Sequence, residues 1–179
     1  MPTPFRPALT LLTQYAAYHR DRRNIQTHLV GVPMIVFAIG VLLSQPVVAY
    51  SWLLITPAWV LFVLSSLWYV TRGEFALQVA VVAVMALLIG SAQVLGHSSP
   101  SWVVWGVGLF VLGWVIQFVG HYYEGRKPAF ADDLVGLLVG PMFVVMELLA
   151  ALGACRGLMA RIEAEAGAPY LRDLTGTAA

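Results

Sequence analysis

Three histidines, His19, His28 and His121, lie at or near the ends of long apolar segments. Neutral imidazole is the commonest metal ligand among protein side chains. Histidines and carboxylates that leave coordination positions open suit iron(II) and dioxygen, whereas a closed set of four ligands suits structural zinc. These residues are therefore candidate ligands of a catalytic metal. Each of them alone also fits an interfacial or hydrogen-bonded structural histidine.

The second candidate feature is the stretch from Gln117 to Glu124, which reads Gln-Phe-Val-Gly-His-Tyr-Tyr-Glu and closes an apolar run. On a helix, Gln117, His121 and Glu124 stand at positions i, i+4 and i+7 and share one face. Such a stripe indicates a site, although His and Tyr also occur in the interfacial belts of membrane helices. Gln117 and Glu124 are therefore candidate catalytic residues beside His121.

The spacing of the first two histidines requires a break in the helix. His19 and His28 are nine residues apart and would point to opposite faces of one straight helix. Asn24 is a favoured N-cap, and it lies four residues before His28 on the same face of a new helix. We expect the break at Asn24 and keep this residue as a candidate for the site.

Charged residues near these positions form a third group. Glu147 lies inside an apolar run, where a carboxylate is costly unless it is paired, so it is either a functional group or the partner of an arginine such as Arg126 or Arg23. Arg20, Arg23 and Arg126 could bind a substrate carboxylate, because the guanidinium group suits bidentate carboxylate recognition. Their simpler role is to set the orientation of the chain in a membrane.

Composition indicates an integral membrane protein. The 179 residues are 60% hydrophobic and 11% charged, and the mean hydropathy is +0.81. The net charge of +1 gives no basic field for a nucleic acid partner. Five nearly charge-free windows each have about the 20 residues that a membrane-spanning helix needs. They are Leu29–Tyr50, Trp52–Thr71, Phe75–Leu95, Trp102–Gly120 and Leu134–Ala154.

The predicted fold is an all-α, polytopic transmembrane bundle. We expect an N-terminal amphipathic helix within residues 1–28, a helical bundle over 29–158 and a C-terminal tail over 159–179, which is loose from Ala164 to Ala179. The fifth window contains Gly136, Gly140, Pro141 and Glu147, which are unfavourable in a plain lipid-facing helix. We therefore expect four full spans and a bent or re-entrant fifth segment.

The distribution of Lys and Arg predicts which histidines meet. Basic residues precede the first window and follow the second and fourth, so the positive-inside rule places the N-terminus and these loops in the cytoplasm. His19, His28 and His121 then lie at one membrane face. His97 falls at the opposite face by the same count.

Two groups of residues resemble the Mpo1-like family of small membrane proteins, and the resemblance covers roughly residues 15–158. The matching positions are Tyr18, His19, Asn24, His28, Pro33, the stretch 117–121, Glu124, Arg126, Pro128, Leu134, Pro141, Phe143 and Glu147.

The resemblance implies an iron(II)-dependent dioxygenase that shortens 2-hydroxy fatty acids by one carbon. It implies a location in the endoplasmic reticulum membrane of a eukaryote or the inner membrane of a bacterium. His19, His28 and His121 become candidate iron ligands, and a family histidine at the place of His97 keeps that residue as a fourth candidate. The His121-Tyr-Tyr-Glu124 spacing is one residue tighter than the family pattern, which favours Glu124 as a partner of the ligands over a direct ligand.

Other functions fit the same residues. One is a non-enzymatic transporter, channel or lipid-binding scaffold in which Glu147 and the histidines handle protons or packing. Another is a zinc-dependent lipid hydrolase, and a third is haem ligation by two of the histidines. The co-purifying metal, substrate-dependent oxygen consumption and a visible absorbance band distinguish these alternatives.

Overall fold

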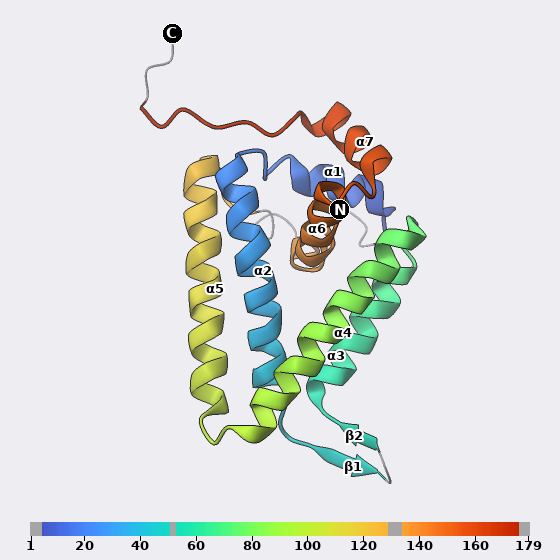
Figure 1. Cartoon of the computed structure of the whole chain (residues 1–179), viewed down its shortest axis with the longest axis vertical. Coiled ribbons are helices and arrows are strands. Elements are labelled where there is room, and N and C mark those ends of the chain that lie inside the picture. The colour runs from blue at the N-terminus through green and yellow to red at the C-terminus, as the bar shows by residue number, and fades with distance from the viewer. Residues whose placement is uncertain (1–4, 51–52, 129–133, 176–179) are drawn as a thin grey trace.

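The computed structural model describes residues 5–50, 53–128 and 134–175. In this part of the chain, seven helices and one two-stranded hairpin account for the regular structure (Figure 1). The elements are α1 (Ala8–Ala16), α2 (Arg22–Leu42), β1 (Val48–Tyr50), β2 (Leu53–Ile55), α3 (Pro57–Val70), α4 (Phe75–Ser98), α5 (Trp102–Glu124), α6 (Gly136–Ala151) and α7 (Arg156–Ala166).

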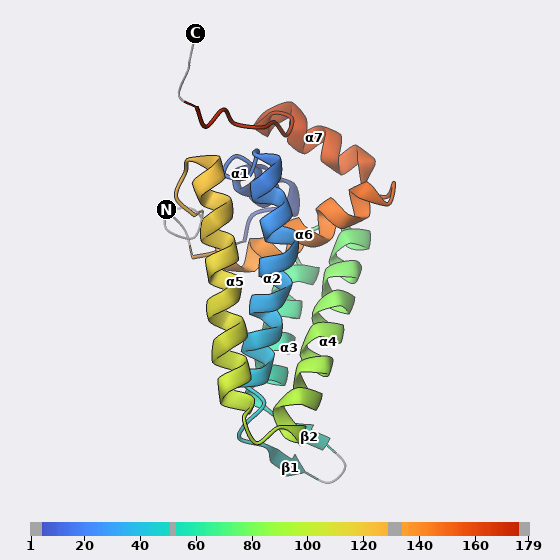
Figure 2. The same cartoon turned by 60° about the vertical axis from the view of Figure 1, so that its left-hand side comes forward.

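Helices α2 and α5 lie side by side and antiparallel, as Figures 1 and 2 both show. Glycines of α5 allow this close approach. A Cβ atom on Gly113 would lie 2.6 Å from Cγ1 of Ile35, and one on Gly120 would collide with Thr27. The contacts fix the relative position of the two helices along their length. They bring the start of α2 level with the end of α5.

Three shorter helices, α1, α6 and α7, pack against one another at the end of the molecule where α2 begins. Helix α1 is amphipathic, as predicted, and its inner face is buried at positions spaced three and four residues apart. It lies against α6 and α7, and its Leu12 shares a fully buried core with Phe143 and Met146 of α6 and Ile162 of α7. This end of the molecule therefore has a buried core of its own, and Figure 2 shows α1, α6 and α7 gathered there beside the long helices.

Three helices, α2, α4 and α5, are long and apolar enough to cross a membrane. The second predicted span differs from the expectation. Its described part forms strand β2 and the 14-residue helix α3. At 1.5 Å per residue α3 is about 21 Å long, shorter than a hydrocarbon core of about 30 Å. The hairpin β1–β2, with Val48 paired to Ile55, takes up residues that hydropathy alone assigns to spans.

The bend predicted for the fifth window lies at its end: α6 fills most of the window, and α6 and α7 meet at 117° across a short break. Pro141 lies within α6, and the bend occurs after it, where Gly153 and Cys155 have positive φ angles. Counted as one broken span, this pair would bring the number of membrane crossings to four. Figure 1 shows α7 at the same end of the molecule as α1 and the end of α5.

Candidate metal centre

The structure brings His19, His28 and His121 together at the end where α1, α2 and α5 meet. His19 lies in the turn between α1 and α2, His28 on the second turn of α2, and His121 on the last turn of α5. All three are buried, and each offers a ring nitrogen within 4.8 Å of the others. The predicted convergence of these side chains at one end of the bundle is therefore found in the fold.

Two backbone carbonyl groups orient two of the rings. Nδ1 of His19 is 2.7 Å from the carbonyl oxygen of Tyr15, and Nδ1 of His28 is 2.9 Å from that of Asn24. A carbonyl oxygen only accepts, so each Nδ1 carries the ring proton and each Nε2 presents its lone pair. Histidines that bind metals are oriented in the same way, by a hydrogen bond from the other ring nitrogen.

The two Nε2 atoms face each other at 3.0 Å. With both protons on Nδ1, this contact joins two lone pairs and is unfavourable unless a cation lies next to both. Burial lowers the pKa of His19 well below its usual range, and the neighbouring ring of His28 lowers it further. His19 is therefore neutral at pH 7 and available as a ligand.

The distance between the rings fits a shared metal ion. Metal–nitrogen bonds of about 2.1 Å place adjacent ligands about 3.0 Å apart at a right angle and about 3.4 Å apart at the tetrahedral angle. The 3.0 Å between His19 and His28 matches the right angle. Nδ1 of His121 is buried and has no hydrogen-bond partner among the described residues. The three imidazole nitrogens thus fit a divalent metal ion such as iron(II) or zinc.

Glu124 holds the loop that carries His19. Its carboxylate accepts hydrogen bonds from the backbone N–H groups of Arg20, at 2.9 and 3.1 Å, and Asp21, at 2.8 Å. Its Oε2 also accepts from Nδ2 of Asn24 at 3.0 Å. Most of these bonds go to Oε2, and together they hold the backbone next to the histidines.

Helix α2 begins earlier than predicted. The N-cap is Asp21, whose side chain accepts from the backbone N–H of Arg23, and Asn24 lies in the first turn. Asp21 is the better cap here because its carboxylate also pairs with the Arg23 guanidinium. That hydrogen bond lowers the pKa of Asp21 to about 2. Asn24 instead donates its amide to Glu124 and to the carbonyl of Tyr18.

The three arginines proposed for a substrate carboxylate point elsewhere. Arg20 donates Nε to the carbonyls of Ala16 and His19 and Nη1 to that of Gly167. Arg23 pairs with Asp21, and its guanidinium lies over a tyrosine ring.

Arg126 is exposed and donates Nη1 to the carbonyl of Ala17. Each of the three guanidinium groups is thus held by the loop between α1 and α2 or by the C-terminal segment.

Glu147 lies next to Arg20. Its Oε1 is 3.9 Å from Nη2 of Arg20, and both side chains are largely buried. The sequence allowed Glu147 to be either a functional group or the partner of an arginine. The structure places an arginine beside it, and this arginine is Arg20 instead of Arg23 or Arg126.

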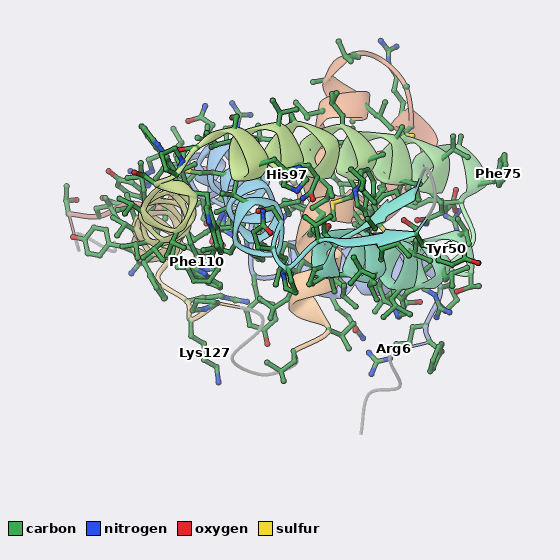
Figure 3. All side chains as sticks on the ribbon, turned by 90° about the horizontal axis from the view of Figure 1, so that it is seen from below. Arg6, Tyr50, Phe75, His97, Phe110 and Lys127 are labelled. Carbon is green, nitrogen blue, oxygen red and sulfur yellow. The ribbon has the colours of Figure 1, made fainter. Side chains whose placement is uncertain are left out.

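His97 does not join the cluster. It lies at the far end of α4, where its Nε2 is 3.2 Å from the carbonyl oxygen of Ser44. Figure 3 looks onto this end of the bundle. The fourth candidate ligand is therefore separated from the other three by the length of the long helices, as expected from its position after the third window.

A cavity of about 220 Å³ begins at the histidines and runs between α2, α5 and α6. Its polar groups are those of Tyr15, His28, Gln117 and His121, and the remaining lining is apolar. The other lining residues are Val32, Ile35, Val36, Ile39, Phe110, Trp114, Pro128, Gly136, Leu137, Gly140 and Pro141.

Tyr15 is a site residue that sequence reasoning missed. Its ring stacks on that of His19 with centroids 4.1 Å apart and planes 9° from parallel. Its carbonyl orients His19, and its side chain lines the cavity. Burial raises the pKa of the Tyr15 hydroxyl, so this group is a neutral donor. The signal was its position four residues before His19, which puts both on one helical face.

Together, the fold and the site define a helical protein with three helices long and apolar enough to cross a membrane, and with three histidines that could hold a metal ion at the end of an apolar cavity. A family model described as 2-hydroxy-palmitic acid dioxygenase Mpo1-like matches residues 5–152. The chain belongs to this Mpo1-like family. The 2-hydroxy-palmitic acid dioxygenase MPO1 of Saccharomyces cerevisiae is 34% identical to it over 151 residues, which are 83% of each chain. No solved structure matches.

Proposed function

We propose that the protein is an iron(II)-dependent membrane dioxygenase that converts 2-hydroxy fatty acids into fatty acids one carbon shorter. The observation that carries this proposal is the convergence of His19, His28 and His121, with the Nε2 atoms of His19 and His28 3.0 Å apart. The name of the yeast relative, 2-hydroxy-palmitic acid dioxygenase, gives the reaction class and the kind of substrate.

We propose iron as the bound ion because the yeast relative is named as a dioxygenase, and zinc has no redox chemistry to offer dioxygen. His19, His28 and His121 would hold the ion, and Glu124 would position the loop of His19 rather than bind the metal. Three imidazoles leave coordination positions open, and iron(II) with open positions supplies the chemistry of dioxygen activation. Iron and dioxygen are thus the proposed cofactor and co-substrate.

The reaction balances with one dioxygen per substrate. The bond between the carboxyl carbon and the hydroxyl-bearing carbon breaks, and R–CH(OH)–COOH with O₂ gives R–COOH, carbon dioxide and water. The polar end of the substrate must therefore lie at the histidines. The alkyl chain must lie in an apolar space that extends away from them.

The cavity meets both requirements. Along α2 it extends from His28 to Ile39, which is eleven residues or about 16 Å of helix. An extended chain advances about 1.2 Å per bond, so the cavity accommodates about a dozen carbons of an acyl tail. Trp114 and Phe110 of α5 line the same space. A membrane lipid enters such a cavity without crossing water, since the apolar helices around it lie in the bilayer.

Metal analysis and oxygen consumption test the proposal. The full chain, purified in detergent without chelators, is expected to contain about one iron per chain and to consume oxygen when 2-hydroxypalmitate is added, with pentadecanoate as product. His28→Ala and His121→Ala are expected to lose iron and turnover, whereas His97→Ala, a histidine outside the cluster, retains both. Zinc in place of iron, or turnover unchanged by His28→Ala, would overturn it.

A further inference from the structure

Gln117 presents an unpaired amide to the cavity. The side chain is 4% exposed, and its Nε2 has no hydrogen-bond partner among the described residues. It lies on α5 one turn before His121 and lines the cavity together with His28. A buried amide donor without a partner is unfavourable, and such groups call for an explanation.

The opposite helix makes room for this amide. Gly31 of α2 faces Gln117, and a Cβ atom at Gly31 would lie 2.5 Å from Nε2. Any larger residue would displace the amide from its position beside the histidines. The position of the Gln117 side chain therefore depends on both α2 and α5, unlike that of a side chain on the surface.

Another buried glutamine shows what a purely structural role looks like. Gln93 of α4 accepts a hydrogen bond from Thr56 with its oxygen and donates Nε2 to the carbonyl of Gly40. Both ends of that amide are satisfied within the protein. Gln117 differs because its Nε2 donor has no partner among the described residues and is available to a molecule that enters the cavity.

The cavity has no cationic partner for an acidic head group among the three candidate arginines. Arg20, Arg23 and Arg126 are bound to the loop before α2 and to the C-terminal segment, and none of them lines the cavity. A carboxylate that reaches the histidines is therefore not paired by any of these three arginines, and the unpaired Gln117 amide is a neutral donor placed at the cavity wall.

We infer that the Gln117 amide donates a hydrogen bond to the carboxylate of the bound 2-hydroxy acid and holds this group next to His28 and His121. The inference rests on the proposed function and extends it by naming a substrate-binding residue. Hydrogen bonds to charged acceptors are stronger than those to neutral ones. Gln117 therefore makes the site selective for an acid over a neutral lipid of the same length.

The test measures equilibrium binding without dioxygen, so that no turnover is needed. The full chain in lipid nanodiscs is titrated with 2-hydroxypalmitate and with 1,2-hexadecanediol, which has the same length and lacks the carboxylate. Gln117→Leu is expected to raise the Kd for the acid roughly ten- to hundredfold and that for the diol less than threefold. Gln117→Glu, which opposes one carboxylate with another, is expected to weaken binding of the acid at least as much.

Gln93→Leu is the matched control, and it is expected to leave the ratio of the two Kd values unchanged. Bound metal and the thermal unfolding of each variant show whether the site is still formed. An acid-to-diol ratio in Gln117→Leu equal to that of the unmodified protein would overturn the inference. This outcome is independent of the proposed function, which fails instead if iron is absent or oxygen is not consumed.

Discussion

At the scale of single residues, the metal centre depends on groups that do not touch the metal. Glu124 accepts three different donors from the loop of His19, and two of them are backbone N–H groups. A carboxylate suits this place because it only accepts. Glutamine has the same shape but would turn an NH₂ group toward those donors.

Glu124→Gln is therefore expected to lower metal affinity about 10–100-fold and to destabilise the protein by about 1–3 kcal/mol. Competition with a chelator of known affinity and thermal unfolding measure the two effects. Glu165→Gln, at an exposed position of α7, is the control and changes neither. Unaltered metal affinity in Glu124→Gln would show that the loop does not need this carboxylate.

Glu147 is a different case, because it contacts Arg20 at 3.9 Å and does not line the cavity. Glu147→Leu is expected to destabilise the fold by about 1–3 kcal/mol, since the buried guanidinium loses its carboxylate. Turnover per bound metal is expected to stay the same. Arg161→Leu, which removes an exposed ion pair with Glu74, is expected to change stability by less than about 1 kcal/mol. Loss of turnover in a stably folded Glu147→Leu protein would assign this residue to the reaction.

The sequence predicted the location of the three histidines better than the contacts of the three arginines. The sequence shows where the apolar runs begin and stop. These positions predict that His19, His28 and His121 lie at the same end of the bundle. The direction of a guanidinium depends instead on its acceptors. For Arg20 one of these is the carbonyl of Gly167, 147 positions later in the chain, and no spacing rule connects them.

At the scale of elements, the pairing of α2 and α5 sets the distance between His28 and His121. Gly113→Leu would place a side chain against Ile35, where even a Cβ atom is too close. We expect a loss of about 1–3 kcal/mol in stability, together with weaker metal binding because the helices separate. Gly108→Leu on the same helix meets nothing within 4 Å and is the control. Equal metal affinity in both variants would mean that the helix pair does not position the site.

Hydropathy predicted the long helices α2, α4 and α5 but not the structure between Leu43 and Pro57. Strands and helices made of apolar residues have the same mean hydropathy, so hydropathy does not tell them apart. Only the 14-residue length of α3 and the pairing of Val48 with Ile55 distinguish these elements from membrane spans. The start of α2 was missed for a similar reason. Asp21 and Asn24 are both good caps, and the contact of Asp21 with Arg172 of the distant C-terminal segment favours the earlier one.

At the scale of the whole molecule, the C-terminal segment lies against the loop between α1 and α2, which carries His19. The predicted loose tail is instead bonded to the loop of His19 over part of its length. Tyr170 donates its N–H to the carbonyl of Arg20 and accepts from the N–H of Arg22, and Arg172 donates its N–H to Asp21. The loop is thus held by Glu124 on one side and by the C-terminal segment on the other.

Removal of residues 167–179 is therefore expected to weaken metal binding and to speed hydrogen exchange of the Arg22 amide, which loses its acceptor. The expected loss of metal affinity is about tenfold, since supporting groups of this kind typically contribute 10–100-fold. Leu171→Ser, an exposed side chain of the same segment, is the control and leaves both properties unchanged. If the truncated chain binds metal as tightly as the full chain, α5 alone holds the loop, and the C-terminal segment only covers it.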